Sequence, residues 1–367
     1  MRKIKEKQRI AFVIPSLGAG GAERVVSTLA NALIKDYEVY IITFIEVIPF
    51  YQLQKEVQLL HCVDKIAPSK NIFSALKNNY FLLKNINAIV QKEKIQLIVG
   101  FLTSANVLSV LAAKKNRIPS IISERINPSM TRTAFIWKFL RKLTYSKANF
   151  LTVQTKEIQD YYLATIKKER IVILPNPISE ELSLKRDSNA IKENVILNVG
   201  RLTYQKAQDV LIKSFSKIDY KNWKLVIIGE GPKKKEYDQL IEKLDLKDRV
   251  IIKSKTKNID KYYNSCRIFA FSSIFEGFPN ALIEAMHFGI PCISTDCPTG
   301  PSELIEDGIN GFLIPMNNEE VLTEKINQLI LKEDLRLSCG KNGQKTVDQF
   351  KVDSVVKQWN KIIKRCL

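Results

Sequence analysis

Histidines and closely paired cysteines are scarce in this chain of 367 residues. It contains two histidines and six cysteines, and no two cysteines form a C-x-x-C pair. A structural zinc ion is usually held by four such ligands at close spacing, so we expect no zinc site. The cysteines are instead expected to be buried free thiols, as is usual in a reducing compartment.

Long apolar runs are also missing. No stretch approaches the roughly 20 apolar residues that a membrane-spanning helix needs. Basic residues 1–9 and the apolar run 10–17 superficially resemble a signal peptide, but Pro15 and the glycine-rich segment 18–21 follow at once, without a small-residue cleavage site. We therefore expect a first strand at 10–14 and a cytoplasmic protein.

Acidic residues are few in the first half of the chain. Residues 1–178 contain 27 Lys and Arg against 12 Asp and Glu, whereas residues 179–367 contain 30 against 26. The two halves therefore carry +15 and +4 of the total charge of +19. A general enrichment of the protein in lysine would raise the positive charge of both halves about equally. The asymmetry favours a basic first half that docks on an anionic membrane surface, where each basic residue contributes on the order of 1 kcal/mol.

Short apolar runs alternate with helical patterns along the whole chain. Such alternation is typical of parallel sheets covered by helices on both faces. The predicted strands are 10–14, 38–44, 97–101, 120–123, 150–154 and 171–174, followed by 195–199, 224–228, 250–253, 268–272 and 291–294. Two series, each opening with a glycine-bearing turn, predict an α/β protein of two doubly wound domains.

The boundary between the two domains is expected in the segment 175–194, which is first proline-containing and then polar. We place the first domain at 1–178 and the second at 179–350. The remaining residues, 351–367, are predicted to form a helix, because Val355, Val356, Trp359 and two isoleucines recur on one face of it.

The segment 267–294 is the most informative part of the sequence. It is predicted to run from a buried strand through a loop with Gly and Pro into a helix at 281–288, and then into the next strand. Asn280 stands where an N-cap is expected, and Gly289 is expected to end the helix. The start of a helix offers free N–H groups at the positive end of its dipole, so this loop predicts a phosphate site.

Two carboxylates frame this predicted phosphate site, Glu276 in the loop and Glu284 in the helix. Carboxylates repel phosphate, but they are good acceptors for sugar hydroxyls. A phosphate site beside hydroxyl acceptors indicates a nucleotide sugar as the ligand.

Five segments, in this order along the chain, resemble elements of the retaining glycosyltransferases of family 4. They are the Gly-rich loop 16–24, the G-R-L-x3-K element within 198–206, the G-E-G-P turn 229–232, the E-x7-E pair Glu276 and Glu284, and the segment 307–315, expected to be a hairpin. The resemblance covers nearly the whole chain. It implies the GT-B fold, with two facing Rossmann-like domains and a C-terminal helix that crosses back onto the first.

The resemblance also assigns roles to residues. Arg201 and Lys206 follow the first strand of the second domain and are expected to bind the donor diphosphate, since both are cationic donors. Glu276, the expected catalytic residue, would hold hydroxyls of the donor sugar, and Glu284 would hold the ribose. The remaining residues expected around the donor are Gly20, Gly21, Glu230 and the backbone N–H groups of Phe278, Asn280 and Ala281.

The sequence departs from many relatives after the fourth strand of the first domain, where they place a histidine. Here that stretch reads Ser123-Glu124-Arg125, so the general base is unassigned and Glu124 and Arg125 are the candidates. We expect His287, in the helix after Glu284, and His61, in a connecting segment, to be structural.

The resulting hypothesis is a retaining glycosyltransferase that transfers a hexose or N-acetylhexosamine from a UDP-sugar. The acceptor would be a lipid-linked glycan of a bacterial surface polysaccharide, such as O-antigen, capsule or exopolysaccharide. The sequence has no D-x-D triplet, so we expect neither metal nor other cofactor. We also expect peripheral attachment to the inner face of the cytoplasmic membrane, through the basic amphipathic segment 132–147 or the segment 72–94.

Two alternatives stay open at this point. A nucleotide-sugar epimerase or phosphorylase with two Rossmann domains is one, although such epimerases use a set of carboxylates and histidines that two histidines scarcely supply. A basic nucleic-acid-binding protein is the other. It would need aromatic side chains interleaved with basic ones along a groove, whereas the predicted site loops contain Gly, Pro and Glu. We therefore expect no nucleic-acid partner.

Overall fold

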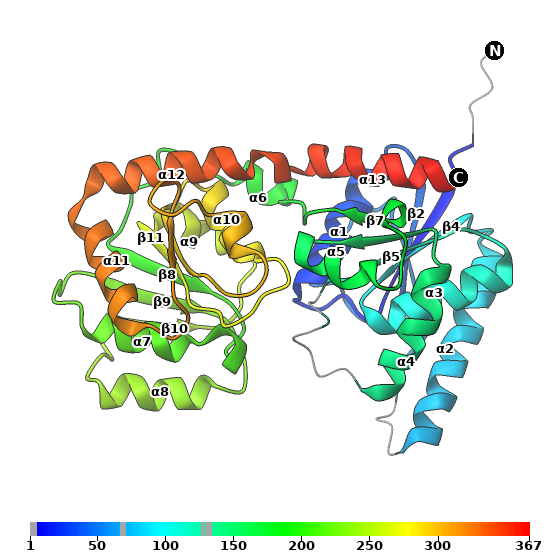
Figure 1. Cartoon of the computed structure of the whole chain (residues 1–367), viewed down its shortest axis with the longest axis horizontal. Coiled ribbons are helices and arrows are strands. Elements are labelled where there is room, and N and C mark those ends of the chain that lie inside the picture. Colours follow the sequence, from blue (N-terminus) through cyan, green and yellow to red (C-terminus); the bar gives the residue numbers. More distant parts are fainter. Residues whose placement is uncertain (1–5, 67–70, 126–127, 129–133) are drawn as a thin grey trace, which may run out of the picture. The chain divides into compact units, whose positions relative to one another are not determined.

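The structure is a computed structural model that describes residues 6–66, 71–125, 128 and 134–367 (Figure 1). The chain divides into two compact units. The first unit contains residues 1–177 together with 352–367, and the second contains residues 178–351. Each unit has its own parallel sheet, so the predicted α/β fold with two doubly wound domains is confirmed.

The first unit has a parallel sheet with the strand order β3-β2-β1-β4-β5-β6-β7. The strands are β1 (Arg9–Ile14), β2 (Glu38–Ile45), β3 (Gln58–Val63), β4 (Leu97–Phe101), β5 (Ser120–Ser123), β6 (Phe150–Val153) and β7 (Ile171–Ile173). The helices are α1 (Gly21–Leu33), α2 (Ile72–Lys92), α3 (Thr103–Asn116), α4 (Phe135–Thr144), α5 (Lys156–Leu163) and α13 (Val352–Cys366). The strand order reverses between β1 and β4, which is the position where doubly wound sheets bind ligands.

One strand of this sheet was not predicted. Strand β3 lies at the sheet edge and pairs with β2 in parallel, and it contains His61, which the sequence placed in a connecting segment. That placement of His61 was wrong. An edge strand keeps one side open to solvent, so β3 has no fully buried residue and lacks the apolar run that marks a central strand.

Helix α13 packs into the core of the first unit through one apolar face. Val355, Trp359 and Ile363 are fully buried, and the Trp359 ring stacks on Phe101 with the ring centroids 5.9 Å apart. These contacts place the last helix of the chain in the same core as the central strands β1 and β4.

The second unit has a parallel sheet with the strand order β10-β9-β8-β11-β12-β13. The strands are β8 (Val195–Val199), β9 (Lys224–Ile228), β10 (Val250–Lys253), β11 (Ile268–Phe271), β12 (Cys292–Thr295) and β13 (Phe312–Ile314). The helices are α6 (Glu180–Leu184), α7 (Gln208–Ser216), α8 (Lys234–Lys243), α9 (Ile259–Ser265), α10 (Asn280–His287), α11 (Glu319–Leu331) and α12 (Glu333–Val347). Within the described residues, no helix of either unit is both long and apolar enough to cross a membrane.

The prediction of a hairpin at 307–315 was wrong. Asp307 to Gly311 form a tight turn, in which the N–H of Gly308 donates to the carbonyl of Gly311, and the chain then enters β13. Strand β13 pairs with β12 in parallel, and the Asp307 carboxylate accepts from the N–H of Leu313. The turn therefore delivers the chain to an open sheet edge beside β12 instead of folding it back on itself.

Helix α10 buries His287, of which 3 % is exposed. Neither ring nitrogen has a hydrogen-bond partner among the residues that the structure describes. Burial, together with the positive charges of Arg186 and Lys351, lowers the pKa of this histidine to about 4. The imidazole is therefore neutral in the folded protein at any pH near neutrality, as a structural role requires.

This buried histidine predicts a loss of stability in mild acid. Between pH 6.5 and pH 4 the unfolded chain binds a proton at His287 while the folded chain does not, so unfolding becomes easier as the pH falls. By pH 5 the loss is on the order of 1–2 kcal/mol, allowing for partial screening. The free energy of unfolding, measured with urea, should fall less between pH 7 and pH 5 in His287→Leu than in the parent. His61→Gln, at the exposed histidine, is the control, and equal losses in all three proteins would contradict the assignment.

Candidate functional site

The second unit brings two loops together at the carboxyl edge of its sheet. Strands β8 and β11 are neighbours and pair in parallel, with Ile196 opposite Ile268. The loop after β8 contains Arg201 and Lys206, and the loop after β11 contains Glu276. Residues that are far apart in the sequence therefore meet at the edge where ligands of doubly wound sheets bind.

Lys206 and Glu276 form a buried ion pair at this edge. The ammonium Nζ lies 2.6 Å from Oε1 of the carboxylate, and the two side chains are 16 % and 7 % exposed. The ammonium also lies 4.6 Å from the centroid of the Phe271 ring. Two predicted site residues thus meet in one contact, which leaves each charge compensated in the absence of a ligand.

Hydrogen bonds between the two loops, and one from the loop after β12, hold this pair in place. The Gln205 side chain donates from Nε2 to the carbonyl of Phe275, and the N–H of Ile274 donates to the carbonyl of Gln205. The hydroxyl of Ser272 donates to the carbonyl of Lys206, and the hydroxyl of Thr299 donates to the carbonyl of Glu276. The backbone on both sides of the ion pair is therefore fixed before any substrate binds.

The G-E-G-P turn supports the loop after β8. A Cβ atom on Gly229 would lie 1.9 Å from the carbonyl oxygen of Gly200, and one on Gly231 would lie 2.3 Å from that of Leu202. Only glycine permits so close an approach of two backbones. Glu230 was expected in the donor site. Its carbonyl accepts a hydrogen bond from the N–H of Leu202. Its carboxylate is exposed, with Oε2 3.8 Å from Nζ of Lys255. The structure therefore joins Glu230 to the site through its backbone.

The predicted phosphate site at the start of α10 differs in detail from the expectation. The helix begins at Asn280 with Pro279 in the N-cap position, so placing Asn280 at the N-cap was wrong. The N–H of Asn280 donates to the carbonyl of Phe278, because the chain makes a tight turn there. In the described part of the chain, the N–H groups of Phe278 and Ala281 have no such backbone partner. They are therefore better placed than the N–H group of Asn280 to donate to a phosphate.

Glu284 is buried one turn into α10, and its Oε2 accepts a hydrogen bond from the hydroxyl of Tyr263 at 3.0 Å. The tyrosine comes from α9 and was not predicted as part of the site. Arg201 differs from the other predicted residues because its side chain is exposed, directly after Gly200. The guanidinium is therefore free to take up a new position toward a ligand.

In the first unit, Gly20 and Gly21 stand at the start of α1. Gly20 is the N-cap residue, with extended backbone and no capping side chain, and Gly21 is the first residue of the helix. A Cβ atom on Gly20 would lie 2.0 Å from the Glu23 carboxylate, so that side chain would have to move to admit a larger residue. Glycine has no side chain with which to cap the start of α1, and a helix start of this kind suits a phosphate or hydroxyl ligand.

Glu124, one of the two candidates for a general base, is fully buried after β5. Its Oε2 accepts from the hydroxyl of Tyr145 at 2.9 Å and from that of Tyr162 at 3.0 Å. Burial raises the pKa of this carboxyl group, while the two hydroxyls and Arg141 oppose the rise. These contacts assign Glu124 to the packing of α5 and of the turn after α4 against the sheet, so we do not retain it as a base.

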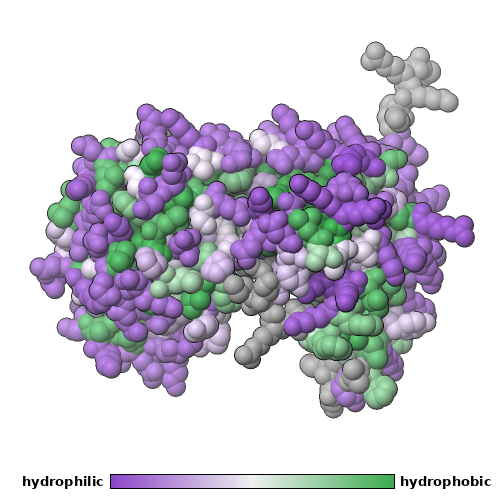
Figure 2. Space-filling model, in the orientation of Figure 1, coloured by the Kyte–Doolittle hydropathy of each residue, from purple (hydrophilic) through white to green (hydrophobic). Residues whose placement is uncertain are grey.

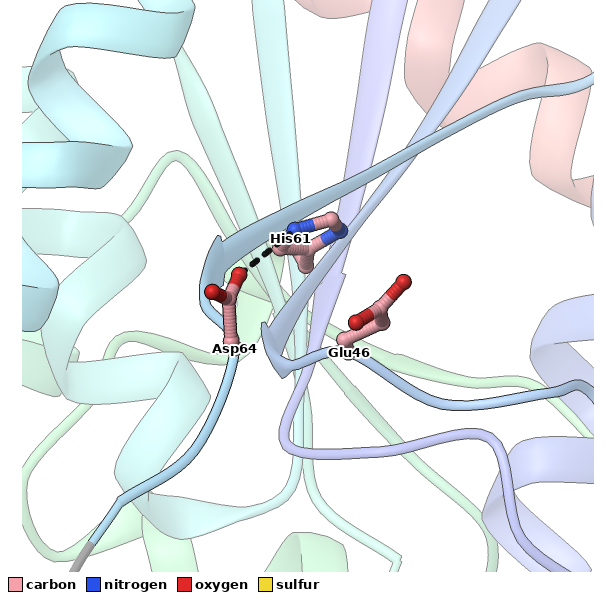
Figure 3. Close-up of side chains that lie close together, drawn as sticks. All are labelled: Glu46, His61 and Asp64. Carbon is pink, nitrogen blue, oxygen red and sulfur yellow. Dashed lines mark ion pairs between the residues drawn. The ribbon is translucent and has the colours of Figure 1, made fainter.

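Glu46, His61 and Asp64 lie close together at the ends of β2 and β3 (Figure 3). The Nε2 of His61 is 3.4 Å from Oδ1 of Asp64, and one ligand atom from each of the three residues lies within 4.8 Å of the others. All three side chains are exposed at a sheet edge. Ordinary solvated charges at a surface account for this arrangement.

Comparison with known proteins identifies both units. Residues 19–182 match the family model of Glycosyltransferase Family 4, and residues 182–346 match that of Glycosyl transferases group 1. The Campylobacter jejuni enzyme GalNAc-alpha-(1->4)-GalNAc-alpha-(1->3)-diNAcBac-PP-undecaprenol alpha-1,4-N-acetyl-D-galactosaminyltransferase is 30% identical, over 97% of this chain and 98% of its own. The amylovoran biosynthesis glycosyltransferase AmsD of Erwinia amylovora is also 30% identical, over 94% and 96%.

Solved structures show the same architecture. The crystal structure of Anabaena Alr3699/HepE in complex with UDP matches 98% of this chain and 100% of its own with a TM-score of 0.80, at 19% sequence identity. At that identity the match establishes the fold, which is GT-B, as predicted. Because the curated relatives align over nearly their full lengths and both units match glycosyltransferase family models, the chain belongs to the family 4 type of GT-B glycosyltransferases.

Proposed function

We propose that the protein is a retaining glycosyltransferase that transfers a hexose or N-acetylhexosamine from a UDP-sugar to a lipid-linked glycan of a bacterial surface polysaccharide. The buried pair of Lys206 and Glu276 beside the start of α10 is the main support. It places a cation suited to a diphosphate next to a carboxylate suited to sugar hydroxyls. The relatives' names support the acceptor class, since the Campylobacter enzyme acts on a glycan linked to PP-undecaprenol.

In the proposed reaction, Lys206 turns from Glu276 to the diphosphate when the donor binds. The N–H groups of Phe278 and Ala281 and the exposed Arg201 complete the set of donors around the phosphates. Glu276, released from the lysine, accepts hydrogen bonds from hydroxyls of the donor sugar, and Glu284 accepts from the ribose. Once the donor is bound, these groups surround the diphosphate and neutralise the charge that develops on the departing UDP.

The transfer itself breaks the bond between the anomeric carbon and the oxygen of the β-phosphate. The acceptor hydroxyl attacks the same face of the sugar, and its proton passes to the phosphate oxygen that leaves. The chemistry needs no protein base in this scheme, which agrees with the structural role of Glu124. It also needs no metal ion, because Lys206, Arg201 and the helix start supply the positive charge.

A screen of UDP-sugars tests this function directly. One UDP-sugar should raise the melting temperature of the protein, undergo slow hydrolysis and serve as donor to a lipid-linked glycan with the anomeric configuration kept. Transfer should continue in EDTA. A product of inverted configuration would refute retention, and activity that EDTA abolishes and Mn²⁺ or Mg²⁺ restores would refute the metal-free mechanism.

We further propose that α2 and α4 attach the first unit to an anionic membrane. Among the described residues, seven of the twenty exposed large hydrophobic side chains belong to these two helices. They are Phe73, Leu76, Tyr80 and Phe81 on α2, and Phe135, Phe139 and Leu143 on α4. Both helices pack on α3, and neither carries an acidic residue (Figure 1). Figure 2 shows apolar surface over this part of the first unit.

Arg141 of α4 does not belong to the basic surface that the sequence predicted for the segment 132–147. Arg141 is buried, and its Nη2 lies 3.3 Å from the hydroxyl of Tyr161. Its guanidinium lies 5.8 Å from the ring centroid of Tyr161 in α5, and the Glu124 carboxylate attracts it. Lys138 and Lys142 are exposed. They are the charges of this helix that can reach a lipid headgroup.

Replacing Lys138 and Lys142 together by Ser should weaken binding to phosphatidylserine vesicles about 5- to 30-fold, since each contributes up to about 1 kcal/mol. Phe135→Ser with Phe139→Ser should weaken it as well, because apolar area is withdrawn from the headgroup region. Lys167→Ser with Lys168→Ser, which removes the same charge elsewhere in the unit, is the matched control. Vesicle flotation is the measurement, and equal losses in the lysine pair and the control would refute the role of α4.

A further inference from the structure

Three buried polar side chains gather at the carboxyl edge of the first unit's sheet. Strands β5, β6 and β7 lie side by side in parallel, and Arg125, Gln154 and Asn176 follow them within a few residues. All three are buried, including Arg125, which is 8 % exposed. The donor residues proposed above lie in the second unit, and the proposed reaction needs no protein base, so Arg125 and its neighbours have no role in it.

The hydrogen bonds within the cluster fix the orientation of each group. Nη1 of Arg125 donates to Oδ1 of Asn176 at 2.5 Å, and Nε2 of Gln154 donates to the same oxygen at 2.7 Å. An arginine can only donate, so Asn176 must present its oxygen to it. Gln154 must then present its nitrogen to that oxygen, which turns its own carbonyl oxygen away from Asn176.

The cluster leaves three polar atoms unmatched. Among the described residues, no hydrogen-bond partner is found for Nε and Nη2 of Arg125 or for Oε1 of Gln154. The Arg125 guanidinium lies 4.8 Å from the Phe101 ring centroid, and Glu124 directs its Oε2 to two tyrosines instead. Buried polar groups in proteins are nearly always paired, and a buried guanidinium needs an anion most of all.

The unmatched atoms define the chemistry of a ligand. Nε and Nη2 form one edge of the guanidinium plane and donate in parallel, the arrangement that grips two oxygens of a phosphate or carboxylate. The free Oε1 of Gln154 requires a donor beside that oxyanion, such as a hydroxyl. Burial lowers the pKa of Arg125 to about 9, so the group keeps its positive charge at neutral pH.

We propose that Arg125, Gln154 and Asn176 form a binding site for a glycosyl phosphate, with Arg125 on the phosphate and Gln154 on a sugar hydroxyl. The inference rests on the proposed function for the identity of the oxyanion. The donor phosphates already have Lys206, Arg201 and the start of α10, so the phosphate at Arg125 belongs to the diphosphate of the acceptor. The guanidinium edge is covered in the structure, and atoms above it must move when the ligand enters.

Three probes separate the sources of the phosphate. Geranyl diphosphate represents the acceptor's diphosphate, UDP represents the donor, and the acceptor sugar as a methyl glycoside contains no phosphate. Titration calorimetry on the full chain should show that Arg125→Gln weakens geranyl diphosphate binding at least tenfold. The Kd of UDP should change less than twofold. Lys115→Gln, which removes an exposed charge of the same unit, is the matched control.

Gln154→Glu guards against a variant that merely fails to fold. Gln154 and Arg125 both bond to Oδ1 of Asn176, so a carboxylate at position 154 places a negative charge close to the guanidinium. A Gln154→Glu protein that still unfolds cooperatively should therefore bind geranyl diphosphate at least tenfold more weakly. A folded Gln154→Glu protein with unchanged geranyl diphosphate binding would overturn the proposal. So would a folded Arg125→Gln protein that binds both diphosphates like the parent, or one that loses affinity for the methyl glycoside equally.

Two further outcomes distinguish a failure of this acceptor site from a failure of the proposed function. If Arg125→Gln weakens the binding of UDP and leaves the binding of geranyl diphosphate unchanged, an oxyanion site exists but binds the donor. That result overturns the assignment to the acceptor. If the parent binds geranyl diphosphate through Arg125 and binds no UDP, the site stands and the proposed donor fails.

Discussion

Replacing Glu276 by alanine is expected to lower glycosyl transfer at least about a hundredfold while leaving UDP affinity intact or slightly increased. The lost hydrogen bonds go to the donor sugar, where they matter most as positive charge develops on the ring, so the effect belongs in kcat. A hundredfold loss corresponds to about 2.7 kcal/mol. UDP should not bind less tightly, because removing the carboxylate frees the ammonium of Lys206, now 2.6 Å from it, for the diphosphate.

Measuring kcat at saturating donor together with the Kd of UDP separates these two effects. Glu276→Gln keeps an acceptor oxygen and should retain more activity than the alanine variant. Glu306→Ala removes an exposed carboxylate from the same unit and is the control for general effects of charge. Thermal unfolding checks that the loss of a buried ion pair has not unfolded the second unit. If UDP affinity falls as far as transfer does, Glu276 does not act on the sugar.

The sequence predicted the fold because central parallel strands leave a strong pattern. Strands buried on both faces are continuous apolar runs, and residues 195–199 and 268–272 were found in this way. The edge strand β3 was missed because its partly exposed residues include Gln58 and His61. The strand β13 was misread for a similar reason, since three residues after a glycine-rich turn do not reveal which neighbour they pair with.

The site was predicted as a set of residues, but its contacts depend on packing that the sequence does not display. The Lys206–Glu276 pair forms because β8 and β11 are neighbours in the sheet, an order that local patterns do not encode. The burial of Arg141 depends on tyrosines that α5 and the end of α4 supply. The cluster around Arg125 was missed for the same reason, although a polar residue directly after an apolar strand, as at Gln154, is a usable signal.

Replacing Lys206 by alanine should weaken UDP binding roughly ten- to a hundredfold, in contrast to the change at Glu276. The variant loses a charge-assisted hydrogen bond to the diphosphate, a contact worth about 1.5–3 kcal/mol. It also leaves the Glu276 carboxylate, which is 7 % exposed, without its cation and close to the incoming phosphates. Titration calorimetry with UDP measures the loss, and Lys217→Ala, at an exposed lysine of the same unit, is the matched control.

The double variant Lys206→Ala with Glu276→Ala distinguishes a phosphate ligand from a purely structural ion pair. If Lys206 binds the diphosphate, removing the carboxylate as well takes away the repulsion, and UDP affinity should recover in part from the Lys206→Ala level without reaching that of the parent. A structural pair would behave differently, since each single variant would then bind UDP as the parent does and lose only stability. Unchanged UDP affinity in Lys206→Ala would therefore remove this lysine from the donor site, and with it the main support for a mechanism without metal.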